Sequence, residues 1–180
     1  MATFTANSIE LGTGAQFVGT ATGLSNAPTG TIIQTAINGS TADITSNSDG
    51  SYTDIISINF TPRQSNSKLI YTLMFNSYTH NGSSGTSNGT SYQVLRDSTQ
   101  IKEAVWCFYL NNTSYTRDFY PTTMIQDFDE PNTTSAITYK LQGRKYSGNS
   151  SNFATRFGEP QRSGSAVGNS IVFKIEELSV

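Results

Sequence analysis

The sequence predicts an all-β protein built as a sandwich or a barrel, and three observations carry that prediction. Short runs of residues alternate between apolar and polar side chains, which is the period of a strand with one buried face. Clusters of Gly, Pro, Asn and Ser separate these runs at regular spacing. Tyr and Phe, with 9 and 10 copies, far outnumber the 3 Met, and no segment has the period of a helix.

The first half of the folded region contains three predicted strands. The run over 31–38 is rich in Ile and ends at an Asn-Gly-Ser turn signal, and the alternating run over 56–60 is ended by Pro62. The run over 67–79 is the longest, and it has apolar residues on both faces. We therefore expect it to be a central strand, or a strand whose second face meets a partner.

The second half contains the remaining strands, each bounded by turn signals. The run over 91–96 leads through a tight Arg-Asp-Ser-Thr turn into 100–110, and Asn111 and Asn112 mark the next turn. Further strands are expected over 116–126, 136–146 and 171–175, with a shorter candidate over 152–157. This pattern is typical of a two-sheet sandwich or barrel.

Residues 1–30 differ in composition from this region. They are rich in Gly, Thr and Ala, and their apolar residues are scattered. Such a segment buries too little apolar surface to become ordered on its own. It is either a flexible tail or an extended arm that becomes ordered against another protein. In the second interpretation the anchors of the arm are Phe4, Ile9, Leu11, Phe17 and Val18.

Composition excludes several classes of function. The chain has 180 residues, enough for one domain with a core. Only 13% of residues are charged and the net charge is −2, whereas nucleic-acid binding depends on Lys and Arg. No apolar run approaches the roughly 20 residues that span a bilayer, and the N-terminus lacks a secretory signal pattern. We expect no nucleic-acid partner, no membrane insertion, and synthesis in the cytoplasm.

Residues suited to catalysis are few. His80 is the single histidine and opens a Gly- and Ser-rich segment, whereas a catalytic base needs rigid support. Cys107 is the single cysteine and lies in an apolar run, which favours a small buried hydrophobic residue. The adjacent Asp129 and Glu130 do not resemble two carboxyls facing each other across a glycosidase cleft. The sequence therefore predicts a non-enzymatic protein without a cofactor.

Two polar segments are candidates for exposed binding loops. The first, over 80–90, includes His80, Asn81 and Asn88. The second, over 127–132, includes Asp127 and Asp129 and reaches Pro131. Its carboxylates are possible Ca²⁺ ligands, but the segment lacks the spacing and the Gly of a helix-loop-helix calcium site. We predict a solvated turn and no metal site, and the sequence leaves the question of Ca²⁺ open.

Five segments carry a resemblance to a known family. In order they are 30–34, the Phe-Thr-Pro to Ser-Lys-Leu-Ile stretch over 60–70, the Leu-Arg-Asp turn within 94–99, and the runs over 134–142 and 169–178. Together they resemble phage structural proteins with a C1q/TNF-like jelly-roll head. Residues 9–19, with Gly23 and Leu24, are similar to attachment segments of phage fibre proteins. The resemblance implies a homotrimer with an attachment arm over 1–30 and an outermost jelly-roll head over 31–180.

A physical argument agrees with a trimer. A sandwich whose strands are apolar on both faces exposes too much hydrocarbon as a monomer, and three copies around an axis would bury it. The residues expected at this trimer interface are Tyr71, Phe75, Tyr139 and Phe173.

Three functions follow from these observations. The first is a fibre or appendage protein on the virion exterior, whose arm binds other virion proteins and whose head contacts a host surface glycan or protein. The second is a capsid decoration protein whose trimer clamps neighbouring coat subunits. A glycan-cleaving enzyme is the most distant alternative.

Overall fold

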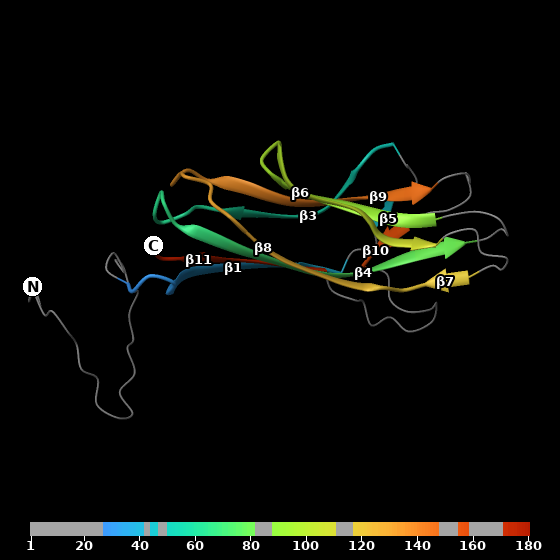
Figure 1. The fold of residues 1–180 in the computed structure, drawn as a ribbon, viewed down its shortest axis with the longest axis horizontal. Coiled ribbons are helices and arrows are strands. Elements are labelled where there is room, and N and C mark those ends of the chain that lie inside the picture. The colour runs from blue at the N-terminus through green and yellow to red at the C-terminus, as the bar shows by residue number, and fades with distance from the viewer. Residues whose placement is uncertain are drawn as a thin grey trace, which may run out of the picture.

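The computed structural model describes residues 27–41, 44–46, 50–81, 88–110, 117–147, 155–158 and 171–180. These residues form two facing antiparallel sheets and include no helix (Figure 1). The predicted all-β sandwich is therefore confirmed.

The larger sheet has seven strands. Its order is β1-β11-β4-β10-β2, and β7 and β8 pair with the remaining side of β4. The strands are β1 (Ile32–Ser40), β2 (Ile44–Ser46), β4 (Lys68–Asn81), β7 (Arg117–Phe119), β8 (Thr122–Asp129), β10 (Thr155–Phe157) and β11 (Ile171–Leu178). Strand β4 lies between β11 and β8 along its first half and between β10 and β7 along its second half. The prediction of a central strand here is confirmed.

The smaller sheet has four strands in the order β3-β9-β5-β6. They are β3 (Thr53–Phe60), β5 (Asn88–Arg96), β6 (Thr99–Leu110) and β9 (Ile137–Ser147). The predicted turn between β5 and β6 is present, and Asp97 in it has a positive φ of 53°. Asp97 is held there by two hydrogen bonds with Thr138 of β9: its N–H donates to the Thr138 carbonyl, and its carboxylate accepts from the Thr138 N–H.

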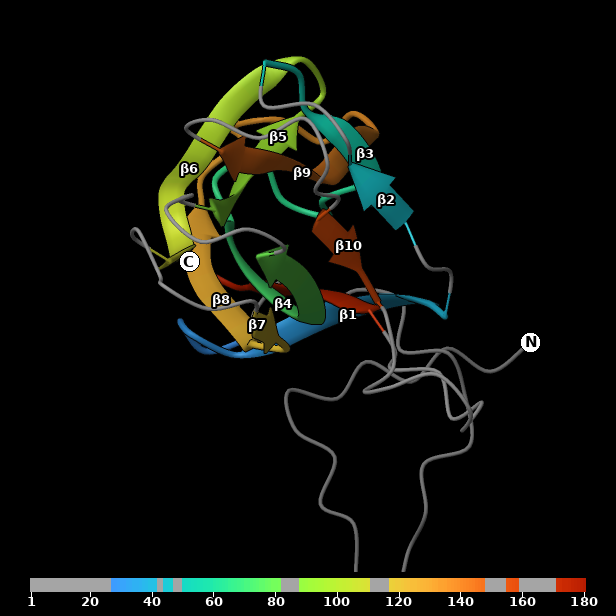
Figure 2. The same cartoon turned by 90° about the vertical axis from the view of Figure 1, so that its right-hand side faces the viewer.

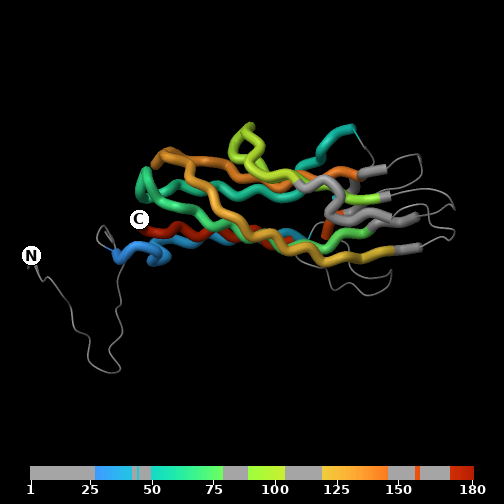
Figure 3. The backbone as a smooth tube through the Cα atoms, viewed as in Figure 1, coloured from blue at the N-terminus to red at the C-terminus, as the bar shows by residue number. Residues whose placement is uncertain are grey.

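Figure 2 views the molecule from one end and shows the two layers facing each other. Their inward side chains form one core, because alternate residues of each strand point to the same face. On β4 these are Leu69, Tyr71, Leu73 and Phe75, each at most 1% exposed. Phe173 and Ile175 of β11 and Tyr139 and Leu141 of β9 complete its centre. Figure 3 shows the backbone crossing from one layer to the other between β8 and β9.

The structure differs from the predicted elements in three ways. The single strand expected over 116–126 is divided into β7 and β8 around Tyr120 and Pro121, because proline has no N–H for the ladder. Strand β8 then continues to Asp129, so Asp127 and Asp129 lie in a strand and not in the predicted acidic loop. The short strand β2 was not predicted, because its Ile-Thr-Ser sequence is too short to show a period.

Glu177 fixes the connection between β3 and β4. Its side chain is fully buried, and its carboxylate accepts hydrogen bonds from the backbone N–H groups of Arg63 and Gln64 and from the Ser67 hydroxyl, at 2.8 to 3.0 Å. Three donors on one loop thus satisfy a carboxylate that burial would otherwise destabilise.

The segment that leads into β1 is fixed beside the C-terminus. The Gly30 N–H donates to the Ser179 carbonyl, the Ser179 N–H donates to the Thr31 carbonyl, and the Ser179 hydroxyl donates to the Pro28 carbonyl. Figure 1 shows the C-terminus beside the start of β1, whereas β4 and β9 finish at the other end of the head. Residues 1–26 therefore join the head at one defined end.

Candidate functional site

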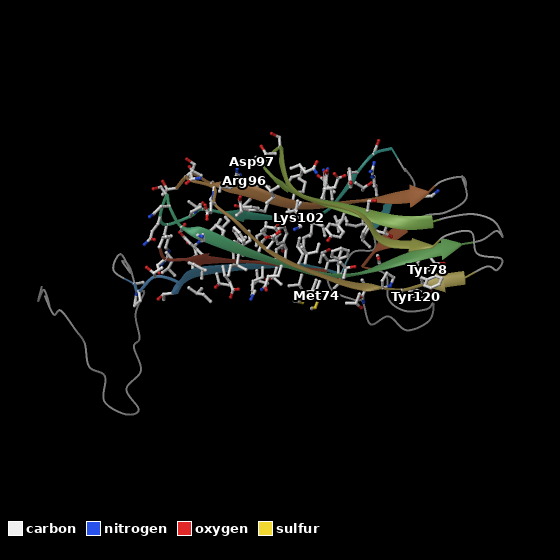
Figure 4. All side chains as sticks on the ribbon, viewed as in Figure 1. Met74, Tyr78, Arg96, Asp97, Lys102 and Tyr120 are labelled. Carbon is white, nitrogen blue, oxygen red and sulfur yellow. The ribbon has the colours of Figure 1, made fainter. Side chains whose placement is uncertain are left out.

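The outward face of the larger sheet carries large apolar side chains in contact with solvent. Ile37 on β1, Met74 on β4, and Met124 and Phe128 on β8 are 65%, 45%, 66% and 64% exposed. Ile32, at the start of β1, is also exposed. Figure 4 shows Met74 on the side of its sheet that faces away from the smaller sheet. We call this surface the outward face.

The strand register joins these residues into one surface. Met74 pairs with Met124 on one side and Val172 on the other, and Ile70 pairs with Phe128. Directly paired residues in adjacent antiparallel strands have Cβ atoms about 4.5–5.5 Å apart, so their side chains are neighbours. The outward face therefore has one apolar group of Met74, Met124 and Val172 and a second of Ile70 and Phe128, and the hydrogen-bonded pair of Thr72 and Gln126 lies between them.

Strand β8 has an inverted pattern at one end, with charges inward and an aromatic ring outward. Asp127 forms an ion pair with Lys102 of β6, and Asp129 accepts two hydrogen bonds of 2.9 Å from the Arg96 guanidinium. Both cations belong to the smaller sheet. Because these carboxylates are held inward, the alternation of the strand directs Phe128 outward.

The same ion pairs affect two ionisable groups. The hydrogen bond from Lys102, assisted by the Phe128 N–H, holds the pKa of Asp127 below its ordinary value. Burial, and then the hydrogen bond that its hydroxyl donates to Asp129, raises the pKa of Tyr139. These groups link the two sheets along the side of the sandwich formed by β8, β5 and β6.

A shallow hollow of about 240 Å³ lies on the outward face, lined by Ile70, Gln126, Asp127 and Phe128. The Lys68 ammonium lies 5.8 Å from the centre of the Phe128 ring and also pairs with Glu130. The hollow is smaller than the roughly 300–1,000 Å³ of typical small-molecule pockets. Its size suits a single apolar side chain.

An aromatic pair extends this surface toward the second half of β4. The rings of Tyr78 and Tyr120 lie 5.0 Å apart with 34° between their planes (Figure 4). Both side chains are half-buried. Such a pair fixes the chain around Pro121, between the end of β7 and the start of β8.

The residues predicted for the trimer interface require a correction. Tyr71, Phe75, Tyr139 and Phe173 are all at most 1% exposed within a single chain, and all belong to its core. Bulky aromatic side chains on these strands fill the space between the two sheets, so they have no surface to offer another copy.

The predicted loop residues lie at the ends of strands. His80 and Asn81 are the last residues of β4, and Asn88 is the first residue of β5, so the connection is shorter than the predicted segment over 80–90. Their side chains, and that of Cys107 in β6, lie outside the described part of the chain. The proposed arm anchors Phe4, Ile9, Leu11, Phe17 and Val18 also lie outside it.

The described residues contain neither a metal-binding cluster nor a membrane-spanning helix. No group of three or more His, Cys, Asp or Glu side chains among them is placed to hold a metal ion. None of them forms a helix that could cross a membrane.

The second apolar face of 67–79 was predicted to meet a partner, but its exposed residue Met74 and the neighbouring Met124 and Phe128 were not named. A signal was present, because the even-numbered residues of β4 include Ile70 and Met74 although its odd-numbered residues already supply a core face. A second signal is the alternation of Met124 and Phe128 with acidic residues in 124–129. Neither signal shows which face points outward, because that depends on the pairing of distant strands.

Comparison with known proteins gives only distant likenesses. No protein-family model matches the chain, and no curated protein matches it. Among solved structures, it is similar to the T13 particle of infectious bursal disease virus, with a TM-score of 0.35, 9% identity and 82% of this chain covered. The VP2 subviral particle of the same virus gives a TM-score of 0.36, 12% identity and 83% coverage. The chain spans 38% of the length of each of these two chains, and likenesses at this level carry no argument about its function.

Proposed function

We propose that the chain is a non-enzymatic structural protein of a bacteriophage particle, and that its head associates into a homotrimer through the outward face. The observation that carries this proposal is the exposed apolar surface of Ile37, Met74, Met124 and Phe128. Four large apolar side chains exposed on one face of one sheet favour an interaction surface there. The assignment to a phage particle rests on the resemblance of the sequence to phage jelly-roll heads.

The strand order supports a jelly-roll head. Strands β1, β4, β8 and β11 alternate along the chain with strands of the smaller sheet, because the chain crosses between layers before and after β3, after β4, after β6, and before and after β9. A double sheet of eight such strands is the arrangement of a jelly roll. The shorter strands β2, β7 and β10 extend the larger sheet around the second half of β4.

The apolar side chains of the outward face are enough to drive weak association. Completing the burial of Ile32, Ile37, Met74, Met124 and Phe128 contributes about 5 kcal/mol per copy. Association costs about 4–15 kcal/mol in lost freedom of motion. The number of three copies in this proposal comes from the resemblance to phage jelly-roll heads.

The position of the termini supports an attachment role for residues 1–30. They enter the head at the end fixed by Ser179, and the ends of β4 and β9 lie at the opposite end. If the arm binds the virion, the opposite end of the head remains exposed. We propose a fibre or appendage head on the virion exterior that contacts a host surface glycan or protein there.

Measuring the mass of the full chain in solution at micromolar concentration tests self-association. We expect a trimer, and we expect Met124→Glu to give a monomer because it places a charge within the patch. Ser57→Glu is the matched control, since Ser57 is exposed on β3 of the smaller sheet. A full chain that remains monomeric would refute the proposal.

Imaging of labelled protein on particles tests its location. We expect label on tails or appendages. Dense label over the head shell would support the decoration protein instead. Release of shorter products from host polysaccharide by the purified protein would show that it is an enzyme after all.

A further inference from the structure

One row of residues across the outward face has no polar side chain. Met74 on β4 pairs with Met124 on β8 and with Val172 on β11, and Val172 pairs with Gly39 on β1. The neighbouring row, two residues along each of β8, β4 and β11, presents an amide, a hydroxyl and an ammonium group, those of Gln126, Thr72 and Lys174. Two methionines are thus at the centre of an apolar row that borders a polar one.

Both of these methionines are open to solvent in the single chain. Met74 is 45% exposed and Met124 is 66% exposed, and Figure 4 shows Met74 pointing away from the smaller sheet. Directly paired residues have Cβ atoms about 4.5–5.5 Å apart, so the two thioethers are neighbours. Met1 is the remaining methionine of the chain and lies outside the described residues. Small water-soluble oxidants can therefore reach both sulfur atoms of the pair.

We propose that Met74 and Met124 form an oxidation site that controls the association of the head. This inference rests on the proposed self-association and names its regulation. Hydrogen peroxide transfers one oxygen atom to each thioether sulfur: an S–O bond forms, the O–O bond breaks, the sulfur is oxidised to a sulfoxide and the peroxide is reduced to water. Methionine sulfoxide reductases reverse the change, so the site is switchable in both directions.

The sulfoxide changes the chemistry of the row at its centre. It converts a flexible apolar side chain into a polar one, and its oxygen needs a hydrogen-bond donor. Water supplies the donor on the free head, whereas the side chains of the same row, including Val172, supply none. Burying a polar group without a hydrogen-bond partner weakens association by about tenfold or more. Two sulfoxides in each copy should therefore weaken association by about 100-fold.

Association and oxidation then oppose each other. Association through the outward face covers the two sulfur atoms, so the associated head should react slowly with peroxide and the free head quickly. The coupling is reciprocal, because a modification that weakens association is itself disfavoured by association. Oxidation therefore acts on free heads and prevents them from assembling, whereas heads that have already associated are protected.

Treatment of the full chain with hydrogen peroxide tests the proposal. Mass spectrometry of peptides locates the sulfoxides, and the mass in solution is measured before and after treatment. Met74→Leu/Met124→Leu is the matched control, because leucine keeps the apolar volume at two exposed positions and has no sulfur. This variant retains Met1 and Cys107, so oxidation elsewhere affects both proteins equally. We expect peroxide to dissociate the unmodified chain but not the variant, and sulfoxide reductase to restore association.

The mass of the untreated chain separates the two levels of failure. If the untreated chain associates, and both sulfoxides form without loss of association, the oxidation site is refuted and self-association stands. Equal dissociation of the unmodified chain and the leucine variant would refute it too, because the responsible group would lie elsewhere. Absence of sulfoxide at Met74 or Met124 in the dilute chain would contradict their accessibility. An untreated chain that is monomeric would overturn both proposals.

Discussion

The carboxylate of Glu177 lies 2.8 Å from the Ser67 hydroxyl, although the two residues are 110 positions apart in the sequence. The same carboxylate accepts hydrogen bonds from the backbone N–H groups of Arg63 and Gln64. The last strand of the larger sheet thus fixes the loop that leads into its central strand. The sequence does not indicate this contact, because Glu177 follows Glu176 and resembles another solvent-facing residue of the strand.

Replacing Glu177 by Ala should destabilise the head strongly. The substitution leaves the N–H groups of Arg63 and Gln64 without their acceptor, whereas the Ser67 hydroxyl keeps its bond to the Gln64 carbonyl. Each unpaired buried donor costs about 1–3 kcal/mol. We expect a loss of about 3–5 kcal/mol in the free energy of unfolding, measured in urea. Glu130→Ala is the matched control, because its ion pair with Lys68 is half exposed and contributes less than about 1 kcal/mol. Similar losses in the two variants would contradict the prediction.

Replacing Gly143 by Ala should also destabilise the head, through overpacking. A Cβ atom at Gly143 would lie within 2.6 Å of Phe157 and Ile55 side-chain carbons. We expect a loss of about 1–3 kcal/mol, measured by thermal or urea unfolding. Gly39→Ala should change stability little, since its Cβ would meet only the Ile171 carbonyl at 3.7 Å.

A second substitution, Phe157→Leu, tests whether the cost of Gly143→Ala comes from a clash with Phe157. Phe157→Leu alone should destabilise the core, because Phe157 is fully buried. Combined with Gly143→Ala, the shorter side chain makes room for the added methyl group. The two losses should therefore sum to more than the loss in the double variant. Strict additivity would show that the two residues do not compete for the same space.

The stability of the head should decrease in acid partly through Asp127. Its pKa in the folded state is lowered by Lys102, so its contribution is present above the unfolded pKa of about 3.9 and is lost as the pH falls through the folded pKa. In Lys102→Met the folded pKa moves back toward the ordinary value. We therefore expect a shallower loss of unfolding free energy below about pH 5, differing by less than about 1 kcal/mol because the pair is partly exposed. Parallel pH profiles would contradict this.

Deleting the arm should leave a folded, self-associating head that no longer joins the particle. The expected boundary between arm and head falls after residue 30, but Pro28 and Gly30 are hydrogen-bonded to Ser179. Deletion of 1–26 keeps these bonds, whereas deletion of 1–30 removes two of them, at about 1 kcal/mol each. We expect equal masses but lower stability for the longer deletion. An unfolded or monomeric product of the shorter deletion would show that the arm belongs to the head.

The sequence was sufficient for the class of fold and for most strands. Alternation identified β3, β9 and β11, and apolar residues on both faces correctly placed β4 in the centre. Alternation defines two faces but not which one is buried. The sequence analysis places the aromatic residues Tyr71 and Phe75 at an interface, whereas side chains of that size fill the wide space between two sheets.

The acidic end of β8 was missed for a different reason. Asp is rare in strands, so local propensity predicted a loop over 127–132. In the structure, Arg96 and Lys102 from the opposite sheet compensate Asp129 and Asp127. These partners are 25 and 33 positions away in the sequence, and a single sequence does not reveal such pairs.

The attachment of residues 28–31 to Ser179 determines how the head would carry a mechanical load. A pull transmitted through residues 1–26 acts along β1, whose ladder with β11 runs from Ile32–Leu178 to Ser40–Ile171. These hydrogen bonds lie perpendicular to the strands, so the pull shears the whole ladder at once and cannot open it one bond at a time. A head tethered through its N-terminus would therefore resist drag forces more strongly than one tethered through a loop at its far end.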